Sequence, residues 1–340
     1  GMTYLRSPAV HHLGVSPWSL KHFAHDLLGR QACKGYFAPP YERPSLELFN
    51  AHAMALIEQH RLSDCHLQRR AEHIELEDAH ARVTLDGGET LRAKHVVLAL
   101  GASEQPSIPE WVHAHRRVQH VFSRDFAFPA MGEGSRVAVI GGGISAGQVA
   151  SRCHALGATV DVFARHMPRV HQFDSDPGWL GPKYMSAFER ERDIERRRKM
   201  IGRARYRGSL PPDVMRALES GMRGGGVVWH QDEVLGMTTQ EERVQLITAT
   251  ARHTFDEVML ATGFSTLRPG GALLSSLSRE LSCARCGYPL TDHLLRWHPR
   301  VFLTGPLAEL ELGPTARNIS GARRAGERLM RYVQIERLAR

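Results

Sequence analysis

The sequence predicts an α/β fold with parallel sheets, and two observations lead to this prediction. Four short, largely apolar runs each end in glycine, and segments with helical periodicity lie between them. One of these runs leads directly into a glycine-rich turn and a helix. Because ligands bind beyond the carboxyl ends of parallel strands, the terminal glycines mark the expected binding edge.

The elements follow from the same patterns. Residues 81–92 alternate between apolar and polar and turn at Asp86-Gly87, which is typical of an antiparallel hairpin. A comparable turn is expected at 286–289, shortly before the last strand. The parallel strands are expected over 94–101, 136–141, 254–263 and 300–305, each of them buried, and the helices over 46–60, 145–156 and 316–332.

A chain of 340 residues exceeds one typical domain of roughly 100 to 200 residues, so we expect two domains. Prolines at 106, 109, 128 and 168 interrupt the chain around the glycine-rich unit and place its boundaries near 130 and 255. We therefore predict that residues 131–255 form a domain inserted into a second one, made of residues 1–130 and 256–340.

The composition predicts a cytoplasmic protein without a membrane partner. Hydrophobic residues make up 42% and charged residues 24%, and no stretch approaches a membrane span or the apolar core of a signal peptide. The five cysteines are odd in number and mostly scattered, which favours reduced thiols over a disulfide framework. The oligomeric state stays open.

The net charge of +8 raises nucleic acid as a partner, and the densest basic stretch spans residues 190–207. The acidic residues Glu189, Glu191, Asp193 and Glu195 alternate with the first arginines there, as in a solvated helix with ion pairs between successive turns. No recognition motif or aromatic platform accompanies the charge, so we expect no nucleic-acid partner.

The strongest motif is a strand, glycine turn, helix and second strand over residues 136–165, the arrangement of a Rossmann-type nucleotide site. Gly141 allows a tight turn, Gly143 lets a pyrophosphate approach the backbone, and Ala146 allows close packing of the helix on the strand. The predicted nucleotide-binding residues are Gly141, Gly142, Gly143, Ile144, Ser145 and Ala146.

The tip of the second strand distinguishes the two nicotinamide nucleotides. An acidic residue there would bind a ribose 2′-hydroxyl, whereas an arginine would pair with a 2′-phosphate. The residues are Ala164, Arg165 and His166, without a carboxylate. We therefore expect NADP(H), with Arg165 at the 2′-phosphate; an ordinary surface arginine is the alternative.

Several segments resemble the flavin-dependent N-hydroxylating monooxygenases of the lysine and ornithine type, within the FAD- and NAD(P)-binding oxidoreductases. Residues 256–264 with Pro269 match that family's D-x3-(L/F)-ATG-(Y/F)-x4-(H/P) signature. Residues 141–146 resemble its GxGQSA motif, with Ile144 in place of glutamine. The segment 42–49 resembles the same family's helix-preceding substrate-side segment, and 118–123 is similar to the H-S element of the wider flavin monooxygenases. The resemblance spans about Leu5 to Gly326.

The resemblance implies a flavoprotein-like fold with two dinucleotide-binding domains, in which NADPH reduces FAD and the reduced flavin transfers one oxygen atom from dioxygen to a small substrate. It implies that residues 1–130 and 256–340 form the FAD-type domain and that residues 131–255 form an inserted NADP(H)-binding domain. Pro306 departs from the aspartate that many flavoproteins place after this glycine. The implied cofactor-side residues are Gly101, Thr262, Gly263, Gly305, Gly313, Pro314 and Thr315.

One family feature is missing, because nothing before Val10 supplies the N-terminal FAD-binding strand and GxGxxG turn. The first strand is central in such a sheet. We expect either that the natural chain extends upstream of Met2, which we favour, or that FAD binding has been lost. In the sheet itself we expect the gap to be filled by a residual N-terminal strand, a partner chain or a closed-up sheet, since buried unpaired backbone groups cost roughly 1 to 3 kcal/mol each.

Two functions follow from these observations. The first is an NADPH-dependent flavin monooxygenase-like oxidoreductase acting on a small amine, an amino-acid side chain or a soft heteroatom; the second is a non-catalytic NADP- or ADP-binding protein that has lost FAD. No catalytic residue is assigned.

Cys283 and Cys286 with His293 and His298 have zinc-like spacing, and the cysteines alone resemble a redox dithiol. Two ordinary thiols near a turn are favoured, and no metal is expected.

Overall fold

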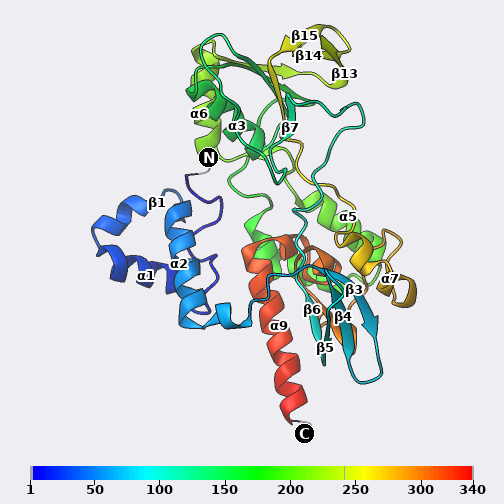
Figure 1. Cartoon of the computed structure of the whole chain (residues 1–340). Coiled ribbons are helices and arrows are strands. Elements are labelled where there is room, and N and C mark those ends of the chain that lie inside the picture. Colours follow the sequence, from blue (N-terminus) through cyan, green and yellow to red (C-terminus); the bar gives the residue numbers. More distant parts are fainter. Residues whose placement is uncertain (1–2, 241, 339–340) are drawn as a thin grey trace. The chain divides into compact units, whose positions relative to one another are not determined.

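The computed structural model describes residues 3–240 and 242–338. This part of the chain forms two compact units, each assembled from separate segments. Unit 1 comprises residues 103–174 and 206–266, and unit 2 comprises residues 3–102, 175–205 and those from 267 onward. Several elements of each unit are labelled in Figure 1.

Unit 1 is built on a five-stranded parallel sheet with the strand order β12-β9-β8-β16-β7. Its central strand β8 is buried on both faces, as the apolar run in the sequence predicts. The strands are β7 (Val118–His120), β8 (Arg136–Ile140), β9 (Thr159–Ala164), β12 (Val227–Gln231) and β16 (Glu257–Leu260).

Each face of this sheet has its own apolar layer. On one face, α3 (Ile144–Ala155) and α6 (Pro212–Arg223) pack through side chains such as Val149 and Leu218. On the other face lies an antiparallel meander, which contributes Val244 and Phe255 to a second core (Figure 1). The meander strands are β13 (Val234–Gln240), β14 (Arg243–Thr248) and β15 (Arg252–Phe255), and a short pair of β10 (Arg169–Val170) with β11 (Ser209–Leu210) completes the unit.

The single strand predicted over 254–263 is wrong, because the structure divides it between two sheets. Phe255 ends β15 in the meander, and β16 starts two residues later in the parallel sheet. Between them, the Asp256 carboxylate accepts hydrogen bonds from the Arg136 amide at 2.8 Å and the Arg243 side chain at 2.9 Å. These contacts fix the point where the chain changes sheets.

Unit 2 contains a sheet of order β17-β18-β6, in which β6 runs parallel to β18, and the antiparallel sheet β3-β4-β5, which includes the predicted hairpin. The long helix α9 (Ile319–Leu338) contacts the first sheet through Tyr332, which lies against His95 and Phe302. The strands are β3 (Ala71–Leu76), β4 (Ala81–Leu85), β5 (Thr90–Ala93), β6 (Val96–Leu98), β17 (Arg296–His298) and β18 (Val301–Leu303).

Strand β6 has a free edge, although the sequence predicts a buried strand with its gap filled. Among the described residues no strand pairs with its second side, and Val97 is 49% exposed. Val96 and Leu98 make the hydrogen bonds to β18, so the backbone N–H and C=O of Val97 point to the free edge. At the surface these groups can hydrogen-bond to water. The free-energy cost expected for buried unpaired backbone groups therefore does not arise at this edge.

The described N-terminal segment of unit 2 folds mainly as helices and adds no strand to the sheet of β6. Helices α1 (Ser19–Leu28) and α2 (Leu46–Gln59) enclose a small core that includes Leu20 and Leu48. The Ser45 hydroxyl caps α2 by accepting a hydrogen bond from the Leu48 amide. Before this cap, β1 (Phe37–Ala38) and β2 (Arg43–Pro44) form a two-stranded antiparallel sheet.

The basic stretch near residue 200 is less solvated than the sequence suggests. It starts at the last residue of α4 (Pro182–Arg190) and continues through α5 (Ile194–Ala204), which Asp193 caps. Arg197 and Arg198 turn inward and pair with Glu311 and Glu309 of unit 2, respectively.

The other described helices of unit 2 are short. They are α7 (Leu277–Glu280), α8 (Glu309–Leu312) and the 3-10 turns η1 (Ala32–Tyr36), η2 (Leu62–Cys65), η3 (Pro177–Leu180), η4 (Gly271–Leu274), η5 (Gly305–Ala308) and η6 (Pro314–Arg317).

The boundaries of the two units differ from the predicted limits at 130 and 255. Residues 103–130 fall in unit 1, because β7 joins the parallel sheet beside β16. Residues 175–205 fall in unit 2, because α5 is tied to α8 by the arginine–glutamate pairs. The assignment of a cofactor to each unit stays a prediction.

Candidate nucleotide-binding site

The turn between β8 and α3 requires glycine at its first position. Gly141 has a φ of +139°, a conformation that L side chains rarely adopt. A Cβ atom here would also overlap the carbonyl oxygen of Ala261, the residue that follows β16. The close approach of two neighbouring strand ends therefore fixes this residue.

Helix α3 begins with unsatisfied donors. Gly143 is its N-cap, with extended backbone, and no side chain accepts a hydrogen bond from the first turn. The first-turn amide groups of a helix have no partner inside the helix, and the helix dipole adds partial positive charge there. The amides of Ile144, Ser145 and Ala146 lie at the carboxyl edge of the sheet, where the sequence predicts the phosphates of a nucleotide.

Close packing of α3 depends on two small residues. Ala146 is fully buried next to the glycine turn, as the motif predicts. Gly147 is a second requirement, because a Cβ atom on it would overlap the Leu210 side chain of β11. The sequence contains Gly147 but not the information that β11 lies against the helix, so its role was not predicted.

Arg165 and His166 follow β9 at the same edge. Arg165 is exposed. The His166 ring lies over the glycine turn, since Cβ atoms built on Gly142 and Gly208 would meet it at 3.0 and 2.6 Å. Its Nδ1 donates to the Met167 carbonyl at 2.8 Å, which fixes the ring. His166 and Gly208 are thus site residues that the motif alone did not identify, because Gly208 reaches the turn from a distant loop.

The end of β16 carries the Ala261-Thr262-Gly263 turn. Gly263 has a φ of +76°, and the Thr262 hydroxyl donates to the Ser107 carbonyl within unit 1. Phe264 then stacks on Phe122 with ring centroids 4.6 Å apart. Thr262 and Gly263 therefore shape the chain as it leaves the sheet, and nothing in the described residues tests their predicted contact with a cofactor.

The buried His120 lies at the end of the neighbouring strand β7. Burial lowers the pKa of its imidazole, and its Nδ1 accepts a hydrogen bond from the Phe122 amide. A ring held neutral in this way is a structural group next to the Gly263 turn.

The predicted flavin-side residues lie in unit 2. Gly101 follows β6 and Gly305 follows the adjacent parallel strand β18, with φ values of +65° and +59°. Gly313, with a φ of +76°, precedes Pro314 and Thr315 in η6. Two of these turns therefore leave the same edge of one sheet.

The fit of these residues to FAD differs between the two ends of the cofactor. Thr315 is 2% exposed, yet its hydroxyl oxygen has no hydrogen-bond partner, as expected of a group awaiting a ligand. For the adenosine end, the residues described in unit 2 contain no glycine-rich turn between a parallel strand and a helix comparable to 141–143. The flavin end fits, and the adenosine end has no counterpart in these residues.

Metal binding at the zinc-like spacing receives no support. No group of three or more histidine, cysteine or acidic side chains in the described residues is arranged to hold a metal ion.

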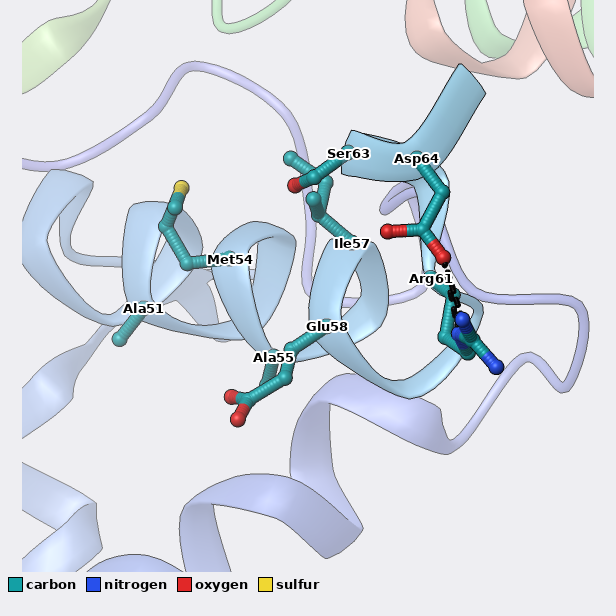
Figure 2. Close-up of a pocket in the computed structure, with 8 residues that line it drawn as sticks. All are labelled: Ala51, Met54, Ala55, Ile57, Glu58, Arg61, Ser63 and Asp64. Atoms are coloured by element: carbon teal, nitrogen blue, oxygen red, sulfur yellow. Dashed lines mark hydrogen bonds and ion pairs between the residues drawn. The ribbon is translucent and has the colours of Figure 1, made fainter. Parts of the chain in front are cut away.

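A separate concavity of about 550 Å³ lies on the exposed side of α2 and η2 in unit 2 (Figure 2). Arg61 and Asp64 form an ion pair at its rim. It contains none of the predicted site residues, so it does not mark the nucleotide site. It is lined by Ala51, Met54, Ala55, Ile57, Glu58, Arg61, Ser63 and Asp64.

Residues 37–319 match the model of the pyridine nucleotide-disulphide oxidoreductase family. The chain belongs to this family. The matched range includes the glycine turn and helix α3. A search of curated protein sequences gives no match.

Solved structures share the fold of this pyridine nucleotide-disulphide oxidoreductase chain at low identity. An ornithine N-hydroxylase of Kutzneria sp. 744 is 16% identical with a TM-score of 0.78, covering 99% of this chain and 88% of that chain. The ornithine hydroxylase of Pseudomonas aeruginosa is 19% identical with a TM-score of 0.71, covering 94% and 83%. A flavin-containing monooxygenase of Stenotrophomonas maltophilia is 21% identical with a TM-score of 0.61, covering 98% and 86%. The predicted flavoprotein-like α/β fold is confirmed.

No helix in the described ranges is both long and apolar enough to cross a membrane.

Proposed function

We propose that this protein is an NADPH-dependent, flavin monooxygenase-like oxidoreductase that acts on a small amine, an amino-acid side chain or a soft heteroatom. The observation that carries the proposal is the uncapped start of α3 directly behind the Gly141 turn. The fold shared with ornithine hydroxylases and a flavin-containing monooxygenase supports the reaction class.

The nucleotide binds at the carboxyl edge of the unit 1 sheet. The amides of Gly143 to Ala146 hydrogen-bond its pyrophosphate, which the helix dipole also favours. Arg165, exposed at the tip of β9, pairs with the 2′-phosphate of NADP(H). Without a carboxylate at that tip, the site has no group to select the free 2′-hydroxyl of NAD(H).

FAD, when bound, supplies hydride acceptance and the activation of dioxygen. The residues of unit 2 that hold its flavin end are Gly101, Gly305 and Gly313, whose backbone turns admit close approach, and Thr315, whose buried hydroxyl offers a hydrogen bond. Pro314 starts the η6 turn in front of α9. Chemistry of this kind needs positioning and exclusion of water from the protein more than an acid–base triad.

The test combines binding with turnover in the full chain. NADPH oxidation is followed at its near-ultraviolet absorbance with and without added FAD, with lysine, ornithine and a thioether as trial substrates, and the visible spectrum of the purified protein is recorded. The thermal unfolding temperature is measured with NADP⁺ and with NAD⁺. We expect stabilisation by NADP⁺ and NADPH oxidation that depends on FAD.

The outcomes separate the parts of the proposal. Stabilisation by NADP⁺ without flavin absorbance, and without FAD-dependent oxidation, would contradict the monooxygenase function and leave a nucleotide-binding protein. An absence of any nucleotide effect would contradict the assignment of the glycine turn itself.

A further inference from the structure

Cys286 differs from the other cysteines in its surroundings. It is exposed, and its sulfur accepts a hydrogen bond from Nη2 of Arg198 at 3.3 Å. Arg198 lies 88 residues earlier in the sequence, so the contact is invisible to the C-x2-C pattern. A guanidinium beside a sulfur attracts the thiolate, which is the nucleophilic form of cysteine.

Arg198 is held firmly in this position. Its Nη1 pairs with the buried carboxylate of Glu309, and its guanidinium lies 4.0 Å from the centroid of the Tyr288 ring. Glu309 also pairs with Arg205 and Arg317. Three guanidinium groups around one carboxylate leave an excess of positive charge in this cluster.

Cys283 is placed to react with an oxidised Cys286. Cys283 directly precedes a tight turn and Cys286 lies within it: the Gly287 amide donates to the Ala284 carbonyl, and Cys283 forms a β-bridge with Pro289 on the returning segment. Burial raises the pKa of the Cys283 thiol, and the neighbouring Cys286 acts in the same direction. Both effects favour the protonated form of Cys283.

We propose that Cys286 and Cys283 form a peroxide-reactive dithiol, with Cys286 as the attacking and Cys283 as the resolving thiol. The Cys286 thiolate attacks one oxygen of a hydroperoxide; the S–O bond forms, the O–O bond breaks, and the leaving oxygen departs as an alcohol or water after taking a proton. The Cys283 sulfur then attacks the sulfenic sulfur, an S–S bond forms, and the second oxygen leaves as water. The hydroperoxide is reduced by two electrons and the dithiol is oxidised.

The chain offers its own controls for this proposal. Cys65 is also exposed, but no hydrogen bond from a described side chain reaches its sulfur. Cys33 and Cys153 are buried, and burial raises the pKa of Cys153 to about 12. The expected order of reaction is therefore Cys286 first, Cys65 second, and the two buried thiols last.

The experiment treats the full reduced chain with hydrogen peroxide, stops the reaction by alkylation, and follows each cysteine by peptide mass spectrometry. We expect Cys286 to be lost about three to ten times faster than Cys65, with a Cys283–Cys286 disulfide as the reducible product. In Cys283→Ser, a dimedone-trapped sulfenic acid should accumulate on Cys286 instead. In Arg198→Met, Cys286 should slow to the rate of Cys65, whereas Arg203→Met, at an exposed arginine of the same helix, should have no effect.

Equal rates for Cys286 and Cys65, or oxidation of Cys286 without a disulfide to Cys283, would overturn the proposal. If circular dichroism shows that Arg198→Met does not fold, the reaction rates of Cys286 and Cys65 with hydrogen peroxide in the unmodified chain still test the proposal. NADP⁺ binding and NADPH oxidation are not used as readouts, so a failure here is distinct from a failure of the proposed function.

Discussion

Arg165 at the tip of β9 is the residue on which the choice of nucleotide depends. We expect Arg165→Asp to weaken NADP⁺ binding by on the order of 1.5 to 3 kcal/mol, because a charge-assisted contact to the 2′-phosphate is replaced by repulsion. NAD⁺ lacks that phosphate and serves as the internal control. Isothermal titration with both nucleotides measures the effect, and an equal loss for both would remove the 2′-phosphate argument.

Gly141 tests the geometry of the turn itself. We expect Gly141→Ala to destabilise unit 1 by about 2 to 4 kcal/mol and to abolish nucleotide protection, since the new methyl group meets both a disfavoured φ and the Ala261 carbonyl. Gly132→Ala is the matched control in the same unit, because its backbone is unstrained and no atom lies within 4 Å of the new methyl group. Urea unfolding gives both values; similar stabilities for the two variants would count against the clash.

His52 predicts a dependence of stability on pH in unit 2. It is 2% exposed, its Nε2 lies 2.8 Å from the Ser19 hydroxyl, and burial lowers its pKa from 6.5 to about 4. The unfolded chain therefore binds a proton more readily than the folded one. The stability from neutral His52 is complete above pH 6.5 and is lost as the pH falls through about 4.

The free energy of unfolding, measured with urea, should be lower at pH 4.5 than at pH 7. His52 should account for on the order of 2 kcal/mol of this difference. In His52→Gln the amide can still bond Ser19 but does not titrate, so the difference should shrink by about that amount. Some dependence will remain, because burial also lowers the pKa of His11 and His12. An undiminished difference in His52→Gln would show that another group is responsible.

Among the elements, α5, α8 and η6 are held together by the carboxylate of Glu309. It is 1% exposed and pairs with Arg198, Arg205 and Arg317. We expect Glu309→Gln to cost about 3 to 5 kcal/mol, because three guanidinium groups then face each other without their counter-charge.

Glu311→Gln is the matched control, at a glutamate two residues further along α8. Its side chain is more exposed and also pairs with two arginines, so its loss should cost less than that of Glu309. Thermal and urea unfolding of both variants provide the comparison. Equal costs would mean that burial of the carboxylate does not set the strength of this cluster.

The elements that the sequence predicts well are those whose signal is local. The β8 strand, the Gly141 turn and α3 follow one another directly, so their residues alone specify the site. The same holds for the hairpin of β4 and β5 and for α2, which begins at its Ser45 cap.

The features that the sequence misses depend on contacts between distant segments. His166 acquires its place only because Gly208 comes back over the glycine turn, and Gly147 because Leu210 packs on α3. The arginine run looked solvated because its partner Glu309 is 111 residues away. Periodicity describes neighbours within one element and contains no information on such pairings.

At the scale of the whole molecule, the described chain passes between its two units at four places, near residues 102, 174, 205 and 266. Each unit nevertheless has apolar cores of its own. A boundary drawn from prolines and composition assumes one insertion, and it therefore missed the return of residues 175–205 to unit 2.

The free edge of β6 gives the molecule a built-in reporter. The Val97 amide points away from β18, while Val96 and Leu98 are bonded to it, so we expect fast hydrogen exchange at Val97 between two protected neighbours. Residue-resolved exchange measurement by NMR or mass spectrometry tests this, and slow exchange at Val97 in the isolated chain would contradict it. Any polypeptide that extends the sheet on this side will slow that one amide, so a change in its exchange rate identifies the arrival of an added strand before its sequence is known.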